Sequence, residues 1–391
     1  TRARRAARPR RGPLASGVSR IGGALPAPDG ILVVDKPLGK TSHDVVAVVR
    51  RASRVRRVGH AGTLDPLATG VLVLCLGSAT RVSEELRSGD KQYEAVVRFG
   101  QATSTYDAEG EPSDAQDISD LTRARLEEAL EAYRGPILQR PPMHSAVHFQ
   151  GRRLYALARS GIEADRAPRA VTVREIEAVD WRPPDLSLRL TVSGGTYVRS
   201  IAHDLGQDLG VGAHLALLRR TAVGRFTLLQ ARSLSDTVEA LEGGWWPLLI
   251  HPTDAALTGM PALVVGSEAE SDIRHGRAFS AAAPEPGLCG PARAYAASGC
   301  FLAVVRWDAD TCRWRPERVF VRLVEVAAPR IRLSLSVGTH FFLEIARLRA
   351  ARWLWSRIVG ACGGSEAAQR LTLHARTSRF GLTVLDPHVN I

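Results

Sequence analysis

One stretch of the sequence combines a carboxylate with a loop of small residues. In VGHAGTLDPLATGVLVLCLGSATR, residues 58–81, Asp65 stands between a loop that contains Gly59 and Gly62 and a strongly apolar run. Aspartate before Pro66 is also an ordinary turn-forming pair, so the stretch alone leaves a structural turn open. If Asp65 instead works as a carboxylate in an apolar site, it needs a partner that keeps it ionised, because burial raises the pKa of a carboxyl group.

Arginine is the best candidate for that partner, and the segment GGTYVRS supplies one. Tyr197 and Arg199 are two residues apart, so on a strand their side chains would share one face and could line a single cavity. The same pair could equally be a surface tyrosine beside an ordinary salt bridge. Tyr93, which follows Lys91 in another apolar segment, could likewise do no more than pack in a strand.

The composition indicates a basic globular protein with two or three domains. The chain has 391 residues, of which 45% are hydrophobic and 24% charged, and its net charge is +12. A positive excess of this size suits a polyanionic partner such as nucleic acid. Three lysines, Lys36, Lys40 and Lys91, flank the Asp65 loop, whereas every other basic residue is arginine. Lysine retained against such a bias suggests a need for a point charge.

The cysteines and the hydropathy pattern exclude several classes of protein. Five cysteines are scattered without a C-x-x-C pair, which indicates neither a zinc site nor a disulfide framework. We therefore expect no bound metal. No run reaches 18 uninterrupted apolar residues and no signal peptide opens the chain, so we expect a soluble cytoplasmic protein that does not bind membranes.

The order of predicted elements indicates an α+β fold with a mixed sheet. Strands are predicted at 31–34, 71–76, 93–99 and 186–192, the second of them central because it is continuously apolar. Helices are predicted behind Thr41-Ser42 and from Asp120 onward.

The same pass along the chain divides it into four parts. They are a disordered basic tail at 1–28, a catalytic domain at 29–245, a small β-rich domain at 255–321, and a tail at 331–391. The last part carries an aromatic helix, HFFLEIARLRAARWLWSRIV, with apolar side chains on nearly every face. We expect that helix to be buried on all sides.

Six segments follow one another between residues 30 and 226. They are GILVVDKPLGKTSHDVV, VGHAGTLDPLATGVLVLCLGSATR, KQYEAVVRFGQATSTYDAEGE, QRPPMHSAVHFQGRRLYALARSG, GGTYVRSIAHDLG and GAHLALLRRTAVGRF. In this order they resemble the motifs of the TruB-type tRNA pseudouridine synthases of bacteria. The resemblance implies a pseudouridine synthase catalytic domain, and for residues 255–321 a small PUA-like RNA-binding domain.

The resemblance also implies roles for individual residues. Asp65 would be the catalytic aspartate, attacking either the uracil ring or the ribose C1′, and Arg199 would pair with it and keep it ionised. Small residues in the loop would then let the RNA backbone approach the carboxylate. The remaining residues would bind the target uridine: Tyr93 by stacking on the flipped base, Tyr197 by enclosing it, His60 by contacting the target loop, and Leu218 by closing the pocket.

The implied activity is isomerisation of a T-loop uridine of tRNA, at position 55, to pseudouridine. The implied partner is the T-arm of tRNA, without a guide RNA, a metal or an organic cofactor, and we expect a monomer. Extruding the target base costs a few kcal/mol in unstacking, which ring contacts offset. A rival of another class is a tRNA-folding chaperone that binds the T-arm and does not need catalysis.

Several other positions have more than one interpretation. Lys36 and Pro37 are predicted to brace the active-site loop, and His214 to cap a helix. At residue 148 the family usually has lysine, so His148 puts one RNA contact in doubt. Three arginines in the predicted RNA-gripping insertion could bind RNA or only face solvent: Arg152, Arg153 and Arg159.

Residues 331–391 carry a second resemblance, to an internal piece of methylmalonyl-CoA mutase. It rests on IRLSLSVGTHFFLEIARLRAARWLWSRIVGACGG and LHARTSRFGLTVLDPHVNI, and it implies that Arg376 and Ser378 are coenzyme A contacts. A full barrel takes about 250 residues, and the chain has no D-x-H-x-x-G cobalamin motif. We therefore expect no mutase activity, and interpret the tail as part of a fragmentary or joined reading frame.

Overall fold

The computed structural model describes residues 27–143, 148–149, 152–153, 166–284, 290–320, 332–337, 341–361 and 372–377. Nearly all of the predicted basic tail at 1–28 lies outside the described residues. So do Arg159, Ser378 and the side chains of four residues whose backbone lies in described strands: His148, Arg152, Arg153 and Arg376.

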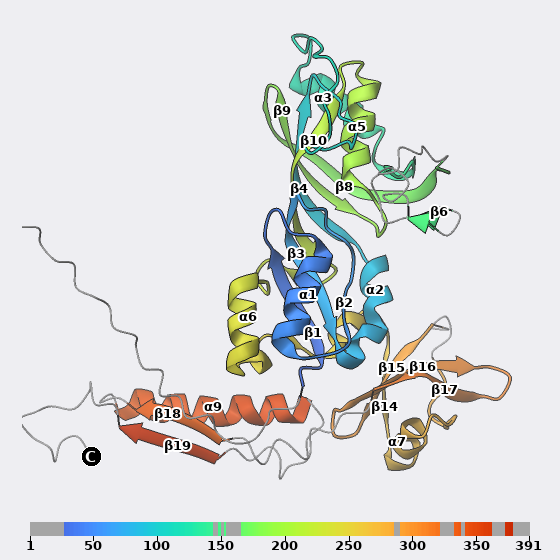
Figure 1. Ribbon diagram of the computed structural model, residues 1–391. Coiled ribbons are helices and arrows are strands. Elements are labelled where there is room, and N and C mark those ends of the chain that lie inside the picture. Colours follow the sequence, from blue (N-terminus) through green and yellow to red (C-terminus); the bar gives the residue numbers. More distant parts are fainter. Residues whose placement is uncertain are drawn as a thin grey trace, which may run out of the picture.

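A large mixed sheet forms most of the molecule (Figure 1). Its strands are β1 (Gly30–Lys36), β2 (Val58–His60), β3 (Ala68–Leu76), β4 (Lys91–Phe99), β5 (Gly135–Gln139), β8 (Arg169–Arg182), β9 (Asp185–Val192), β10 (Ala213–Val223), β11 (Phe226–Thr227), β12 (Arg232–Ser233) and β13 (Ile250–His251). The main path runs β12-β1-β3-β10-β4-β9-β8-β5, and β13, β2 and β11 pair with β1, β3 and β10 respectively. The sheet therefore extends past residue 245, because β13 pairs with β1.

Strand β3 lies in the middle of the sheet, between antiparallel β1 and parallel β10, as its continuous apolar sequence predicts. Every residue of β3 except Thr69 is buried. Leu72 and Leu74 join the core on the face that α1 (Ser42–Ser53) covers, and Val71 and Val73 join a second core on the opposite face. Covering both faces of β3 fixes the loop that enters it.

Two predicted helices are present, and both begin at a capping residue. Thr41 caps α1 through a reciprocal capping box with Asp44. Thr122 caps α3 (Arg123–Glu131), which therefore begins three residues later than predicted. Three further helices of the large sheet region are α2 (Ser83–Ser88), which follows the 3-10 helix η1 (Gly77–Val82), α5 (Val198–Asp208) and α6 (Leu234–Gly243).

Two sequence-based expectations about local structure are wrong. Arg199 does not lie on a strand with Tyr197, because helix α5 begins at Val198 and Tyr197 is its N-cap residue. His214 does not cap a helix. It lies buried in β10, where its Nδ1 is 2.8 Å from the carbonyl oxygen of Gln101.

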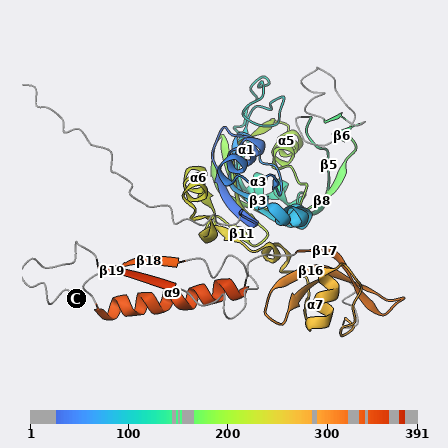
Figure 2. The same ribbon diagram turned by 60° about the horizontal axis from the view of Figure 1, so that its bottom comes forward.

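A second, four-stranded sheet follows the large one along the chain (Figure 2). Three contacts join it to η1 and α2. Arg318 forms an ion pair with Glu85 and donates from Nη1 to the carbonyl oxygen of Arg81 at 2.7 Å, and Arg81 Nη1 donates to the carbonyl oxygen of Val319 at 2.8 Å. A small apolar core that includes Val82 and Phe320 lies at this junction. The elements are β14 (Ala262–Val265), α7 (Ser267–Arg274), β15 (Ala292–Ala296), β16 (Phe301–Asp308) and β17 (Arg313–Val319), in the order β14-β15-β16-β17.

The C-terminal tail contains a β-α-β unit. Strands β18 (Arg332–Val337) and β19 (Thr372–Thr377) are parallel, and α9 (Phe341–Ala361) connects them. The expectation that this helix is buried on all sides is wrong, because Trp353 is 67% exposed and Leu354 52% exposed. Two strands can cover only one side of a helix. No helix among the described residues has both the length and the apolar character needed to cross a bilayer.

Removing residues 331–391 tests whether the rest of the protein depends on this unit. We expect the truncated chain to be more soluble and to keep its melting temperature, because an exposed aromatic helix face promotes association. Static light scattering and thermal unfolding would measure both quantities. A truncated chain that is less soluble and melts at a lower temperature would contradict the expectation.

Candidate active site

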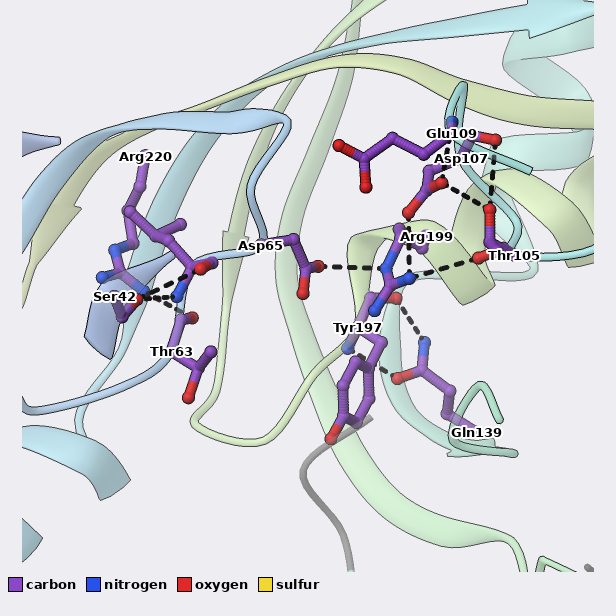
Figure 3. Close-up of polar contacts among 11 residues, drawn as sticks. Ser42, Thr63, Asp65, Thr105, Asp107, Glu109, Gln139, Tyr197, Arg199 and Arg220 are labelled. Atoms are coloured by element: carbon purple, nitrogen blue, oxygen red, sulfur yellow. Dashed lines mark hydrogen bonds and ion pairs between the residues drawn. The ribbon is translucent and has the colours of Figure 1, made fainter. Parts of the chain in front are cut away.

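Asp65 lies in the loop that connects β2 to β3, and its side chain is 33% exposed. Its Oδ2 atom is 3.0 Å from Nε of Arg199, which projects from the first turn of α5 (Figure 3). The ion pair predicted between these two residues is therefore present. One carboxylate oxygen is held by the guanidinium, while the side chain as a whole still reaches solvent.

A second carboxylate holds Arg199 from the other side. Arg199 Nη1 donates to Oδ2 of Asp107 at 2.9 Å and to the carbonyl oxygen of Thr105 at 3.2 Å. The backbone N–H of Glu109 donates to Oδ1 of Asp107 at 3.1 Å. The side chains of Arg199 and Asp107 are only 5% and 3% exposed. The result is a chain of three charged groups that is buried at Asp107 and open at Asp65.

Burial and charge act in opposite directions on Asp65. Partial burial raises the pKa of its carboxyl group, the guanidinium of Arg199 lowers it, and the negative charge of Asp107 raises it again. The net shift is upward. Burial and the same two carboxylates, Asp107 and Asp65, also raise the pKa of the neighbouring Glu109. Asp65 thus needs its arginine to remain an anion.

Side chains from β1 and α1 hold the loop on both sides of Asp65. Ser42 Oγ accepts from the backbone N–H of Leu64 at 2.8 Å and donates to the Leu64 carbonyl oxygen at 3.1 Å. Lys36 Nζ donates to the carbonyl oxygens of Pro66 at 3.4 Å and Pro37 at 3.0 Å. Lys36 is fully buried, and that burial lowers its pKa to about 8. The predicted bracing by Lys36 is thus present in the structure.

Arg220 ties the same loop to the sheet from β10. Its Nε donates to the Val71 carbonyl oxygen at 2.7 Å, its Nη2 to that of Gly62 at 3.2 Å, and its Nη1 to that of Thr63 at 3.4 Å. Arg220 is 1% exposed. Strands β3 and β10 approach each other closely here. A Cβ atom added to Gly70 would lie only 2.2 Å from the Arg220 carbonyl oxygen. Arg220 thus supplies the hydrogen-bond donors that a neighbouring strand would otherwise give to these backbone carbonyl groups.

Tyr197 is fixed through its backbone. The amide of Gln139, which is 2% exposed, accepts from the Tyr197 N–H at 2.7 Å and donates to the Tyr197 carbonyl oxygen at 3.0 Å. The half-exposed ring lies beside Arg199 in Figure 3. Its position next to the Asp65–Arg199 pair is compatible with a wall of the site.

The other predicted site residues surround the loop from three strands. Tyr93 lies in β4 directly opposite Arg220 of β10, and Leu218 lies in β10 opposite Ala68. Both Tyr93 and Leu218 are buried. His60 ends β2. Burial lowers the pKa of His60 to about 4, so its imidazole is neutral at pH 7.

A ring stack supports the loop that carries Asp107. The ring of Tyr106 lies on that of His203 at a centroid distance of 3.7 Å and an interplanar angle of 12°. Tyr106 is adjacent to Asp107, and His203 is one helical turn beyond Arg199. The stack therefore holds the two partners of the buried ion pair together. Tyr106 has a φ of 66°, a strained conformation for a residue other than glycine.

Sequence reasoning missed four residues that position the pair: Ser42, Asp107, Gln139 and Arg220. One signal was available for Arg220. It is two residues from Leu218 in a strand, so it faces the same side of the sheet as an apolar residue, where a charged group needs a specific partner. Asp107 lies in a polar, turn-rich segment that gives no comparable signal.

Two parts of the chain match known protein families. The sequence model "TruB family pseudouridylate synthase (N terminal domain)" matches residues 50–198, and "tRNA pseudouridylate synthase B C-terminal domain" matches residues 199–258. A third model, "Methylmalonyl-CoA mutase", matches residues 322–391. The mutase match thus coincides with the C-terminal β-α-β unit and the residues around it.

Individual relatives agree with the first two matches. The tRNA pseudouridine synthase B of Dechloromonas aromatica is 46% identical over 68% of this chain and 88% of its own length. The enzyme of the same name from Solibacter usitatus is 45% identical over 71% of this chain and 92% of its own length.

Solved structures share the fold. A Cbf5–Nop10–Gar1 complex contains a chain with a TM-score of 0.56 and 27% identity, over 75% of this chain and 84% of that one. An H/ACA RNP bound to a substrate RNA containing 2′-deoxyuridine gives a TM-score of 0.57 at 24% identity, over 75% of this chain and 85% of that one. The second likeness concerns the fold alone.

Replacing Arg220 by methionine tests the loop anchor without leaving a large cavity. We expect the free energy of unfolding to fall by about 3 to 5 kcal/mol, because three buried carbonyl groups lose their donor. Arg219 is the matched control, since it is 40% exposed and pairs with Asp35 on the other face of β10. Its replacement by methionine should cost less than about 1 kcal/mol. Urea denaturation would measure both losses, and equal losses would contradict the anchoring role.

Proposed function

We propose a reaction for the Asp65 site from one premise: the chain belongs to the TruB family of pseudouridylate synthases. It is a tRNA pseudouridine synthase, and the proposal is that it converts a T-loop uridine, at position 55, into pseudouridine. The observation that carries the proposal is the solvent-accessible Asp65 carboxylate held by the buried guanidinium of Arg199. An oriented anion with one open side is what a nucleophile requires.

The proposed reaction rearranges atoms that are already present. Substrate and product are isomers: the bond between ribose C1′ and uracil N1 breaks, the base rotates, and C1′ bonds to C5 of the base. C5 then loses its proton and N1 gains one, so the atoms balance. This isomerisation requires no oxidant, reductant or external group, which fits the proposal that neither a metal nor an organic cofactor takes part. Asp65 attacks either the uracil ring or the ribose C1′, and Arg199 holds the carboxylate ionised and aimed.

The neighbouring side chains receive the flipped base in this proposal. Tyr93 stacks on the uracil, Tyr197 encloses it and Leu218 closes the pocket, while the neutral imidazole of His60 contacts the target loop. Stacking on aromatic rings recovers part of the few kcal/mol that unstacking the base costs. Gly59 and Gly62 leave room for the RNA backbone beside the carboxylate.

We further propose that the T-arm of tRNA binds without a guide RNA, to a monomer in the cytoplasm. The relatives named tRNA pseudouridine synthase B support this choice of RNA. The four-stranded sheet would serve as a PUA-like RNA-binding domain, held to α2 by the Arg318–Glu85 ion pair. The tail would add no mutase activity, because the matched segment, 322–391, is far shorter than a barrel of about 250 residues.

Asp65→Asn separates an enzyme from a tRNA-folding chaperone. With an unmodified tRNA transcript, we expect pseudouridine in the T-loop from the parent protein and none from the variant, because an amide cannot replace the nucleophile. Carbodiimide labelling and primer extension would map the product, and filter binding would show that the variant still binds tRNA. The control Asp185→Asn removes a carboxylate from a surface ion pair with Arg98 and should remain active. Modification by Asp65→Asn would overturn the proposed role.

The pH dependence of the single-turnover rate tests the electrostatics. The reaction needs the anion, so the rate should fall as the pH drops through the pKa of Asp65, which lies above the ordinary aspartate value of about 3.9. Arg199→Gln removes a group that lowers this pKa and should move the acid limb to higher pH. Asp107→Asn removes a group that raises it and should move the limb to lower pH. Shifts of the same sign in both variants would contradict this account.

A further inference from the structure

Five arginines occur within the eight residues 50–57, directly before β2. No acidic residue occurs between Asp44 and Asp65, so this part of the sequence carries only positive charge. Four of these side chains are here called the basic loop: Arg51 in the last turn of α1, and Arg54, Arg56 and Arg57 after it. All four are exposed.

Two hydrogen bonds hold the backbone around the basic loop in place. Arg50, just before it, donates from Nη2 to the carbonyl oxygen of Val58 at 2.9 Å. The carbonyl oxygen of Arg57 accepts from the backbone N–H of Gly77 at 2.8 Å. Arg54 ends α1 in the left-handed conformation, with a φ of 57°. Exposed charges on a fixed backbone lose less entropy on binding a ligand than charges on a flexible segment.

The basic loop gathers four exposed arginines that have no acidic partner among the described residues. Elsewhere, exposed arginines commonly pair with a nearby acid, as Arg98 does with Asp185 and Arg189 with Glu177. Within the described part of the chain, no acidic side chain lies at ion-pair distance from any residue of the basic loop. Its positive charge is therefore not neutralised locally, and it projects into solvent.

The basic loop lies between the candidate active site and the four-stranded sheet. Strand β2 leads from it to His60 over about 10 Å, and the Asp65 loop follows. On the other side, Gly77 begins η1, whose Arg81 contacts β17 of the four-stranded sheet. A ligand that reaches from the Asp65 loop along β2 and η1 towards the four-stranded sheet would pass this surface.

We propose that the basic loop binds the sugar–phosphate backbone of the RNA helix that flanks the target loop. The inference rests on the proposed function, because it takes the target uridine to lie at Asp65. Guanidinium groups bind phosphate oxygens through two parallel hydrogen bonds, and such contacts position an RNA without reading its sequence. The basic loop therefore adds affinity for the RNA helix and takes no part in the chemical step.

The triple variant Arg54→Gln, Arg56→Gln and Arg57→Gln tests this proposal with unmodified tRNA. We expect the Kd to rise at least about tenfold at 0.1 M salt, and the slope of log Kd against log salt to fall by about 2 to 3, because phosphate contacts release counterions. The single-turnover rate at saturating enzyme should stay unchanged. A second triple variant with lysine at the same positions keeps the charge and should restore most of the salt slope.

The matched control removes three charges from another part of the surface: Arg98→Gln, Arg182→Gln and Arg189→Gln, each of which pairs with an acid. Its Kd and salt slope should stay close to those of the parent. The proposal is overturned if the two glutamine variants weaken binding equally, or if the basic-loop variant binds as the parent does. Failure of the proposed function would look different, since the parent protein would then form no pseudouridine in the T-loop, whatever the basic loop does to binding.

Discussion

The ion pair between Asp65 and Arg199 is the interaction on which the rest of the site depends. A carboxylate in a partly buried loop is driven towards its neutral form, and the guanidinium of Arg199 is the strongest charge that opposes this tendency. The cation is itself buried, so it requires a second anion, which Asp107 supplies from a different segment of the chain. Three segments far apart in sequence must therefore meet before one carboxylate can remain ionised and accessible.

Two further buried cations help to keep Asp65 in place and ionised. They lie where the backbone of the Asp65 loop has no strand to pair with. Lys36 and Arg220 both donate to carbonyl groups of the Asp65 loop, and both are almost completely buried. Such groups are costly to desolvate, and their hydrogen bonds to carbonyl groups offset part of that cost. They also carry positive charge towards Asp65, and each lowers its pKa. The same two side chains thus position the loop and favour the ionised form of its aspartate.

Local sequence patterns predicted the parts of this structure that local physics controls. The apolar run of β3 and the capping of α1 by Thr41 depend on neighbouring residues, so both could be predicted. The two-residue spacing of Tyr197 and Arg199 was misread as a strand, because helix α5 begins between them after a glycine turn. Asp107 could not be predicted at all, since its burial depends on a ring stack and on a helix about 90 residues away. Chemistry predicted that a working carboxylate needs a cation, and the family resemblance identified Arg199 as that cation.

The pairing of arginines with acids also determines how positive charge is distributed over the surface. A net charge of +12 spread evenly would attract an RNA at any face. Instead, acids neutralise many exposed arginines of β4, β8, β9 and α3, so the uncompensated charge is concentrated in fewer places. The segment between Asp44 and Asp65 is one of them, and it leads directly into the Asp65 loop. An RNA drawn there by its phosphates arrives beside the carboxylate, so the pairing of arginines elsewhere contributes to selecting where the RNA binds.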